Sequence, residues 1–318
     1  MLASPAALRK RGLLGMNRRN VAFIARHNER RLYPLVDDKK LTKERAMVHG
    51  VAAPTLRDVI DTQHGVRNLG QRLESLNQFA IKPSRGAGGK GIMVILERDG
   101  DFFLKASGQR LTLGHLQRHC SNTLAGLHSL AGAPDSVIIE DLIESNPYFE
   151  PLSVEGVPDI RVIIFRGIPV MAMLRLSTHA SDGKANLHQG AIGVGLDLAS
   201  GQCIHAVQHS SRVHSHPDTG IDLNQIAIPD WQNLLTLAAR CHDLTGLGYL
   251  GADIVVDRKR GPLMLELNAR PGLAIQIANG KGLLPRLEWI EGIKDVPASA
   301  ETRAWMAMTQ FGERNDGA

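Results

Sequence analysis

The stretch LMLELNARPGL, residues 263–273, places two oxygen-bearing side chains, Glu266 and Asn268, inside an otherwise apolar run. In a strand, residues i and i+2 face the same side, so these two project together while the leucines between and before them face the other way. Asp253 lies in the preceding apolar run, GADIVVD, and the short RKRG connection allows the two runs to pair as strands. The pattern predicts three oxygen-bearing side chains on one face of a strand pair.

Converging Asp, Glu and Asn oxygens form a hard site suited to Mg²⁺, which prefers oxygen ligands and keeps phosphate oxygens in its shell. The alternative is a set of ordinary, half-exposed polar positions. The surrounding residues are too apolar for that reading, because a buried, unpaired carboxylate is costly in free energy. We therefore predict a Mg²⁺ (or Mn²⁺) site formed by Asp253, Glu266 and Asn268.

A second motif, KPSRGAGGKGI at residues 82–92, is a glycine-rich loop between two β-rich runs. Glycine allows backbone N–H groups to point inward at positive φ, which forms a nest for anionic oxygens. The spacing matches neither the Walker loop nor the dinucleotide-binding fingerprint. The loop is typical of a cover over nucleotide phosphates, and a plain flexible hairpin is the alternative.

Composition describes a globular protein of 318 residues, 43% hydrophobic and 22% charged. No apolar run reaches the roughly 18–20 residues that span a bilayer, and the start lacks the apolar core of a secretory signal. Three cysteines, Cys120, Cys203 and Cys241, are far apart and odd in number. They indicate reduced thiols rather than disulfides or a zinc motif, so we expect a cytoplasmic protein.

The net charge of +5 arises largely from the first residues of the chain. The basic residues there are Arg9, Lys10, Arg11, Arg18, Arg19, Arg26, Arg30 and Arg31. No aromatic residue is interleaved with them in the pattern that stacks on single strands, so nucleic acid is not favoured as a partner. A solvated helical face is the simplest interpretation, and docking on a membrane or a partner protein is the alternative.

Hydrophobic periodicity predicts an α+β chain. Helices are expected over residues 5–32, 42–49, 55–60, 69–77, 111–125 and 230–246, and near the C-terminus. Strands are expected over residues 78–83, 91–97, 137–143, 159–167, 168–177, 191–198, 202–208, 250–257 and 262–268. The predicted parts are a basic helical segment (1–36), a small lobe (37–136), a large lobe (137–295), and a C-terminal helix and tail (296–318). The histidine-rich stretch 205–218 is predicted to be a polar loop rather than a metal site.

Five segments, taken in their order along the chain, resemble the motifs of a known family. They are DDKKLTKERAMVHGVAAP (37–54), IKPSRGAGGKG (81–91), VIIEDLI (137–143), DIRVIIF (159–165) and GADIVVD…LMLELNARPGL (251–273). Together they resemble the ATP-grasp superfamily, and within it the RimK-like α-L-glutamate ligases, over about residues 37–290. The resemblance implies an ATP-grasp fold in which two α+β lobes clasp ATP.

The resemblance also implies roles for residues at the matching positions. Those for ATP are Lys39, Lys82, Ser84, Gly86, Gly88, Gly89, Lys90, Glu140, Asp141, Leu142 and Glu144. The two lysines and the loop would hold the phosphates, Glu140 with the Asp141–Leu142 backbone the adenine edge, and Glu144 the ribose. The metal ligands would again be Asp253, Glu266 and Asn268. Arg161, Arg175, Lys184 and Arg270 would contact the γ-phosphate, the acyl phosphate or the acid substrate, with structural salt bridges as the alternative.

The implied activity is that of an ATP-dependent carboxylate–amine ligase, which joins an acid, such as glutamate, to an amine or peptide through an acyl phosphate. A kinase-like phosphotransferase and a non-catalytic nucleotide-binding protein remain alternatives. RimK-like ligases carry a whole α/β domain before the first lysine motif, whereas only 38 residues precede Lys39 here. That domain shapes the acid pocket, so a second subunit or another protein could complete the site.

Overall fold

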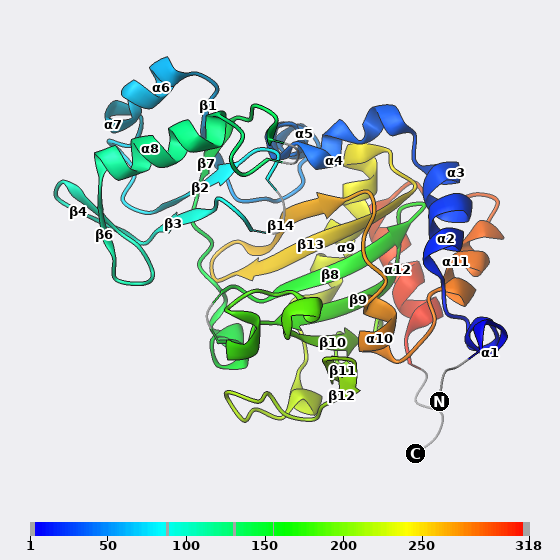
Figure 1. The fold of residues 1–318 in the computed structure, drawn as a ribbon. Coiled ribbons are helices and arrows are strands. Elements are labelled where there is room, and N and C mark those ends of the chain that lie inside the picture. Colours follow the sequence, from blue (N-terminus) through cyan, green and yellow to red (C-terminus); the bar gives the residue numbers. More distant parts are fainter. Residues whose placement is uncertain (1–3, 87–88, 130–131, 155, 314–318) are drawn as a thin grey trace. The chain divides into compact units, whose positions relative to one another are not determined.

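The computed structural model describes residues 4–86, 89–129, 132–154 and 156–313. The chain forms two compact units (Figure 1). The larger comprises Met1–Val36, His49–Ala52 and Glu144–Ala318, and the smaller comprises Asp37–Val48 and Ala53–Ile143. The smaller unit therefore extends through the strand that starts at Val137, past the boundary expected at residue 136, because that strand pairs within its sheet.

A seven-stranded antiparallel sheet organises the larger unit, in the order β12-β11-β10-β9-β8-β13-β14. Its strands are β8 (Asp159–Phe165), β9 (Ile168–Leu176), β10 (Ile192–Leu196), β11 (Cys203–Gln208), β12 (Ser211–Arg212), β13 (Tyr249–Asp257) and β14 (Gly261–Asn268). Strands β8 to β12 form a meander, and the β13–β14 hairpin joins beside β8. Apart from the two-residue β12, each of these strands was predicted from the sequence.

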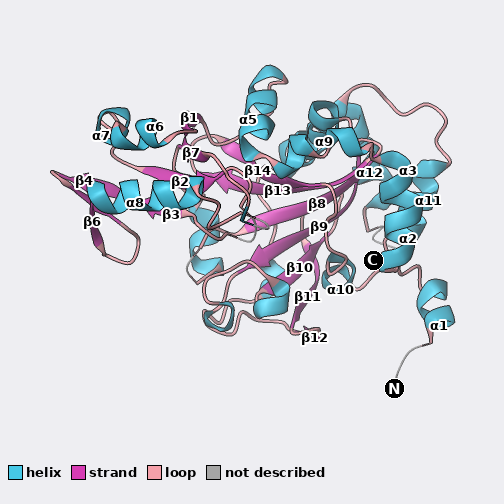
Figure 2. Cartoon of the chain, turned by 45° about the horizontal axis from the view of Figure 1, so that its top comes forward, coloured by secondary structure: helices cyan, strands magenta, loops and turns pink. Residues whose placement is uncertain are grey.

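Helices of the larger unit pack around this sheet (Figure 2). They are α1 (Pro5–Lys10), α2 (Met16–Arg18), α3 (Ala25–His27), α4 (Pro34–Asp37), α9 (Trp231–Thr245), α10 (Ile275–Asn279), α11 (Leu284–Glu291) and α12 (Ala300–Phe311). A π-helix, η1 (Arg19–Ile24), and 3₁₀ turns η2 (Arg30–Leu32), η4 (Pro147–Leu152), η5 (His179–Ser181), η6 (Leu187–Gln189) and η7 (Leu223–Gln225) complete the set. Helix α9 ends as predicted at Gly246, whose φ of 69° suits a glycine C-cap.

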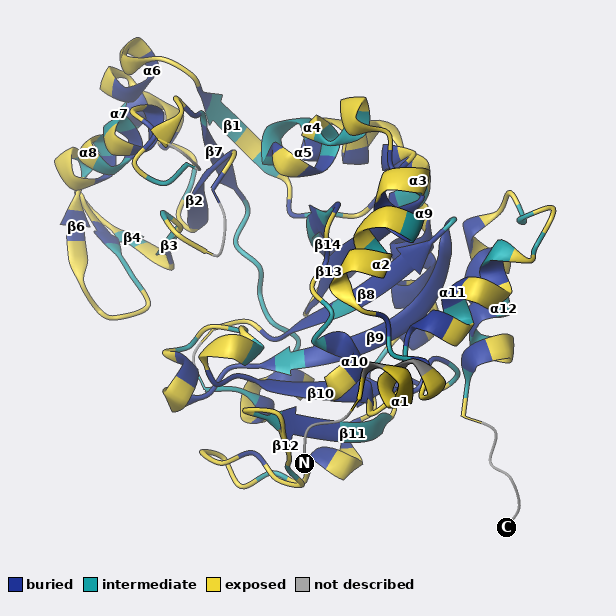
Figure 3. Ribbon diagram, turned by 45° about the vertical axis from the view of Figure 1, so that its right-hand side comes forward, coloured by how far each residue is buried: buried dark blue, intermediate teal, exposed yellow. Residues whose placement is uncertain are grey.

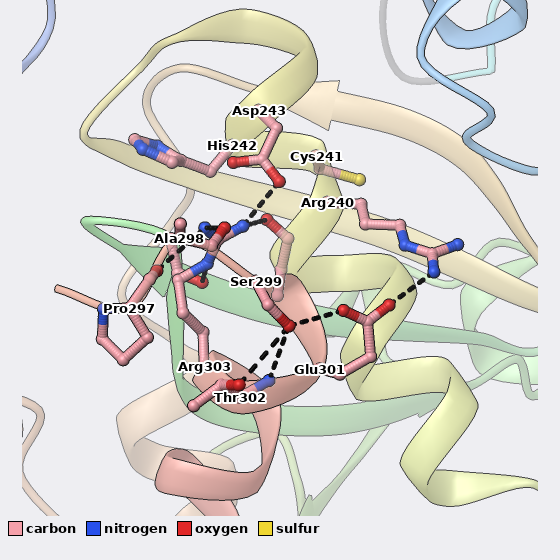
Figure 4. A network of polar contacts seen from close by, with 12 residues as sticks. Arg240, Cys241, His242, Asp243, Pro297, Ala298, Ser299, Glu301, Thr302 and Arg303 are labelled. Carbon is pink, nitrogen blue, oxygen red and sulfur yellow. Dashed lines mark hydrogen bonds and ion pairs between the residues drawn. The ribbon is translucent and has the colours of Figure 1, made fainter.

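One buried arginine attaches α12 to its neighbours (Figure 4). The Arg303 side chain donates to the carboxylate of Asp243 at 2.6 Å and to the carbonyl of Ala298 at 2.7 Å. It also reaches the carbonyls of Gly167, Pro297 and Ala239. A buried guanidinium is tolerated only when its donors are satisfied, so these contacts fix the position of α12 against α9 and the β8–β9 turn.

The basic N-terminal segment is packed into the larger unit. Phe23 is fully buried and meets the ring of Phe165 edge-on at 5.5 Å. Asn28 exchanges hydrogen bonds with the backbone of Tyr249, and Gln276 does so with the backbone of Leu14. The helical segment expected over residues 5–32 consists of short pieces, and the break between the first two lies at Gly12, which adopts a φ of 73°.

The smaller unit contains the antiparallel sheet β1-β7-β2-β3 and a separate sheet β4-β5-β6. Its elements are α5 (Lys39–Val48), β1 (Leu56–Ile60), α6 (Gln63–Arg67), α7 (Leu69–Arg72), β2 (Phe79–Pro83), β3 (Met93–Ile95), β4 (Glu97–Asp99), β5 (Phe102–Leu104), β6 (Arg110–Thr112), α8 (Leu113–Leu124) and β7 (Val137–Glu140). The core of this unit forms between sheet residues such as Phe79 and Ile139 and the α8 residue Leu116. The helix predicted over 111–125 is confirmed as α8.

Two sequence expectations in the smaller unit are wrong. The segment expected as a helix at 55–60 is strand β1, in which Ile60 pairs with Val137 and Val59 with Ile138. Its β-branched residues suit a strand, and the long-range pairing outweighs the helix-start signal at Pro54 and Thr55. The helix expected over 69–77 ends at Arg72, and the residues that follow form turns.

Within the described ranges, no helix is long and apolar enough to cross a membrane.

The packing of Phe23 predicts that the N-terminal segment supports the larger unit. Phe23→Ala should lower the free energy of unfolding of this unit by about 3–5 kcal/mol, because it leaves a cavity between Phe165 and Tyr249. Val21→Ala is the matched control, since Val21 is 72% exposed. All three tryptophans, Trp231, Trp289 and Trp305, lie in this unit, so urea unfolding followed by tryptophan fluorescence reports on it. Equal effects of the two changes would contradict the structural role.

Candidate functional site

A band of charged side chains crosses four strands of the large sheet. Strand pairing places Asp159 opposite Arg175, Arg161 opposite Asp253, and Asp253 opposite Glu266. Asp159 and Arg161 are two residues apart on β8, as Glu266 and Asn268 are on β14, so they share a face of the sheet. Register alone therefore gathers these groups, which lie far apart in sequence, on one side of β9-β8-β13-β14.

Asp253 is the centre of this band and is only 2% exposed. Its two carboxylate oxygens accept a bidentate pair of hydrogen bonds from Arg161, each 2.7 Å long. Arg175 approaches the same carboxylate at 2.9 Å and also makes a bidentate contact with Asp159. The Asn268 amide nitrogen lies 3.4 Å from Asp253 Oδ2 and is the weakest of these donors.

The two buried aspartates of the band have pKa values shifted in opposite directions. Burial alone would raise the pKa of Asp253, but the charges of Arg175 and Arg161 outweigh burial and lower this pKa well below its usual value. The pKa of Asp159 is raised, because burial and the neighbouring Asp253 charge exceed the stabilisation from Arg175. Asp253 is therefore the more acidic member of the pair.

The donor set at the end of the band suits a hard cation. Glu266 and Asn268 are half-buried on β14, and Asp253 faces them from β13, so the residues supply only oxygen ligands. Over the described parts of the chain, no group of three or more His, Cys, Asp or Glu residues could hold a metal ion. Asp253, Glu266 and Asn268 make up a different set, two carboxylates and one amide, whose oxygens are of the kind that Mg²⁺ takes beside phosphate and water.

The four basic side chains predicted to contact substrate do not gather in one place. Arg161 and Arg175 lie in the band, bound to aspartates. The Arg270 guanidinium lies over the Tyr33 ring, 4.9 Å from its centroid. Lys184 is exposed and contacts Asp182 at 2.9 Å within the same loop. Only the first two are held by a buried network.

The smaller unit contains a second buried ion cluster. Glu140 is 1% exposed, and its carboxylate pairs with Lys43 at 2.6 Å and with Lys82. Burial would raise the pKa of Glu140, but the charges of Lys82 and Lys43 lower it. The Glu140 side chain, expected at the adenine edge, pairs with Lys82, the lysine expected to bind phosphate, and both roles stay predictions.

A polar network fixes the start of the glycine-rich loop. Lys39 Nζ donates to the carbonyl of Gly86 at 2.6 Å, and the Lys39 N–H donates to the carbonyl of Ser84 at 2.9 Å. Ser84 is only 1% exposed, and its hydroxyl donates a hydrogen bond to the Asp38 carboxylate at 2.5 Å. The Arg85 N–H donates to both oxygens of Asp135. Ser84 therefore braces the loop from inside, which differs from the phosphate contact expected of it.

The end of the loop is held as well. Gly91 has a φ of 74°, and its carbonyl lies 3.0 Å from His119 Nε2 of α8. A Cβ on Gly91 would lie 2.4 Å from the His128 ring, so only glycine fits there. Gly89 and Lys90 are exposed between these anchors, whereas Gly88 lies outside the described residues.

The remaining nucleotide candidates make local contacts. The Asp141 carboxylate binds Arg57, and the Asp141 N–H donates to the carbonyl of Thr55, so that N–H is already engaged. Leu142 is half-buried. In the larger unit, the Glu144 carboxylate accepts from Lys259 at 3.0 Å. In the histidine-rich stretch, His216 is buried and binds backbone groups, including the Ser177 carbonyl, as a structural residue would.

Sequence reasoning missed four residues that hold these clusters together, namely Asp38, Lys43, Asp135 and Asp159. One of them had a readable signal: Asp159 lies two residues before Arg161 and so shares its strand face. Lys43 and Asp135 reach partners 97 and 50 positions away, on other elements. Local periodicity does not encode such pairs.

The sequence matches a family model, and the structure is similar to several solved structures. The model of the sugar-transfer associated ATP-grasp proteins matches residues 18–292, and no curated protein matches the chain. The structure of D-cycloserine synthetase DcsG has a TM-score of 0.47 and 16% identity, covering 83% of this chain and 72% of that one. The D-alanine–D-alanine ligase of Bacillus anthracis has a TM-score of 0.42 and 14% identity, and the match covers 89% of this chain and 69% of that one. The ATP-grasp ligase PsnB with its minimal precursor has a TM-score of 0.45 and 14% identity. The match covers 83% of this chain and 63% of that one, so this chain spans less than two thirds of that protein.

The lysine–glutamate cluster predicts a pH-dependent stability of the smaller unit. Glu140→Gln should destabilise this unit by about 3–5 kcal/mol at neutral pH, because two buried ammonium groups lose their counter-charge. The lowered folded-state pKa of Glu140 makes its contribution complete above the unfolded value of about 4.3. That contribution is lost as the pH falls from about 4.3 through the folded-state pKa. The difference in free energy of unfolding between wild type and Glu140→Gln should therefore narrow on acidification.

Hydrogen exchange of β2 and β7 measures this effect in the smaller unit itself. Exposed Glu74 provides the control, since Glu74→Gln should leave protection unchanged. A gap between wild type and Glu140→Gln that stays constant on acidification would contradict the assignment.

Proposed function

The chain belongs to the sugar-transfer associated ATP-grasp family, and from that membership we propose that it is an ATP-dependent carboxylate–amine ligase. Membership confirms the ATP-grasp fold and the α+β class expected from the sequence. In the proposed reaction, a carboxylate takes the γ-phosphoryl group of ATP, giving an acyl phosphate and ADP. The amine then attacks the acyl carbon, which releases phosphate and a proton and leaves an amide.

The observation that carries this proposal is the charged band on the large sheet. Asp253, Glu266 and Asn268 offer oxygen ligands beside two arginines, Arg161 and Arg175. A site that handles a phosphorylated carboxylate needs both kinds of group, one for a cation and one for anionic oxygens. No nucleophilic side chain is required, because such catalysis consists of positioning and charge stabilisation.

The smaller unit contains basic side chains and loop amides suited to the phosphates of a nucleotide. We propose that Lys39, Lys82 and the exposed loop residues Gly89 and Lys90 bind the ATP phosphates. Glu140 pairs with Lys82 and holds its side chain in place in a buried setting. Phosphate binding at Lys82 then replaces part of an existing ion pair instead of ordering a free side chain.

Asp253, Glu266 and Asn268 would hold Mg²⁺, which when bound neutralises charge on the β- and γ-phosphates. Asp253 carries a second duty, because its ion pairs orient Arg161 and Arg175. We propose that these two arginines contact the γ-phosphate or the carboxylate of the acid. Arg270, which lies over the Tyr33 ring, and Lys184, which pairs with Asp182, are proposed as contacts to the acid or the amine.

The substrate class is proposed from the sequence resemblance to the RimK-like branch. Glutamate and other amino acids are the first acids to test, with amino acids and peptide N-termini as amines. The decisive measurement is ADP release with pairs of acids and amines, with the amide product identified by mass spectrometry. ADP release that needs the acid but forms a stable phosphorylated product without an amide would replace the ligase with a kinase-like phosphotransferase.

Asn268 separates a metal-binding role from a folding role. Mutating a residue that only hydrogen-bonds to a metal ligand typically lowers metal affinity or activity by about 10–100-fold. Loss of a ligand itself should cost more, so Asn268→Ala should reduce Mg²⁺-dependent ATP turnover by at least about 100-fold. The free energy of unfolding should change by no more than about 0.5 kcal/mol, because the side chain is half-buried and adds little apolar packing. Asn233→Ala, at an exposed position on α9, is the matched control. Parallel losses of stability and turnover in Asn268→Ala would assign the residue to the fold instead.

A further inference from the structure

The first 36 residues carry the positive charge of the whole protein. They contain eight Lys and Arg residues and one Glu, for a net charge of +7, whereas the full chain has +5 and the rest of it therefore −2. Six of the basic residues are exposed and define the basic N-terminal face: Lys10, Arg11, Arg18, Arg26, Arg30 and Arg31. The proposed ATP reaction uses none of these six.

The charges stand on a fixed support. Phe23 and Leu14 are buried beneath the segment, and Asn28 is bonded to the backbone of β13. The outer sides of α2 and α3 are exposed (Figure 3). A disordered basic tail would spread its charge in solution, whereas this segment is held against the larger unit by its buried residues.

Neighbouring acidic groups offset only part of the charge. Arg18 pairs with Glu288 of α11 at 2.6 Å, and Arg26 and His27 lie 3.5 and 3.6 Å from Glu291. Counting these two carboxylates against the segment leaves 7 − 2 = +5. Arg18 and Glu288 are about half exposed and Glu291 is partly exposed, so these contacts weaken the field only modestly.

Exposed apolar side chains lie among the basic ones. Val21 is 72% exposed, Met16 65% and Leu8 38%. The aromatic rings of the segment are taken, because Phe23 is buried and Tyr33 lies under Arg270. The face therefore combines positive charge with flexible aliphatic groups and offers no free ring for stacking on bases.

We infer that the basic N-terminal face docks on an anionic lipid surface. Anionic headgroups attract the arginines over about one Debye length, and Met16 and Val21 then bury their ends at the headgroup–acyl boundary. The same combination does not favour nucleic acid, which would use the charge but has no partner for the exposed aliphatic groups. Docking of this kind is peripheral and needs no spanning helix.

Vesicle binding tests the inference with the full-length protein. The wild type should sediment with vesicles of phosphatidylcholine and phosphatidylglycerol, and not with pure phosphatidylcholine, and added salt should weaken binding. Each basic side chain near an anionic surface contributes about fivefold, so Arg11→Gln, Arg26→Gln and Arg30→Gln together should weaken binding by roughly 100-fold. The matched control removes the same charge elsewhere on the larger unit, with Arg212→Gln, Arg240→Gln and Lys259→Gln, and should bind nearly as wild type.

A second variant tests the apolar part. Met16→Ser with Val21→Ser should weaken vesicle binding by about tenfold while the salt dependence of binding stays the same. Absence of binding to the anionic vesicles, or equal losses in the two Gln variants, would overturn the inference. Binding to duplex DNA or to polyglutamate as tightly as to the vesicles would overturn it as well, in favour of a general polyanion site.

Discussion

The bidentate pairing of Arg161 with the buried carboxylate of Asp253 is the interaction on which the larger unit's site depends. Two charges at this depth are tolerated only because each satisfies the other, and removing either would leave an uncompensated buried ion. The pair spans β8 and β13, so it also specifies the register of those strands. A slip of one residue in either strand would turn the band residues of that strand to the opposite face.

The smaller unit solves a similar problem with lysines. Glu140 on β7 joins Lys82 on the neighbouring β2 and Lys43 on α5, so one carboxylate connects three elements. In each unit a buried acid orients basic groups that the proposed reaction needs. The arrangement has a physical advantage, since a side chain already fixed by an ion pair loses little conformational freedom when it meets phosphate.

The sequence predicted the large sheet well and the long-range contacts poorly. Alternation and β-branched runs between Val137 and Asn268 mark strands clearly, and the i, i+2 spacing of Glu266 and Asn268 gave their common face. The strand at Leu56–Ile60 was missed because its partner β7 lies some eighty residues further along the chain. The second role of Asp253 was missed for the same reason: Arg161 and Arg175 become its neighbours only through strand pairing. Periodicity gives the face of a strand, whereas the partners on that face depend on the order of strands in the sheet.

The occupancy of Asp253 limits how this residue can serve a cation. A carboxylate offers about four lone-pair sites, and Asp253 already accepts two hydrogen bonds from Arg161, one contact from Arg175 and one from Asn268. Of these, the 3.4 Å contact from the Asn268 amide is the weakest and therefore the least costly to give up. Glu266 and Asn268, which are half-buried where Asp253 is almost fully buried, are consequently the more accessible ligands. Cation affinity at this position is thus coupled to the arginine network, because any change at Arg161 or Arg175 alters how many lone pairs Asp253 has left to offer.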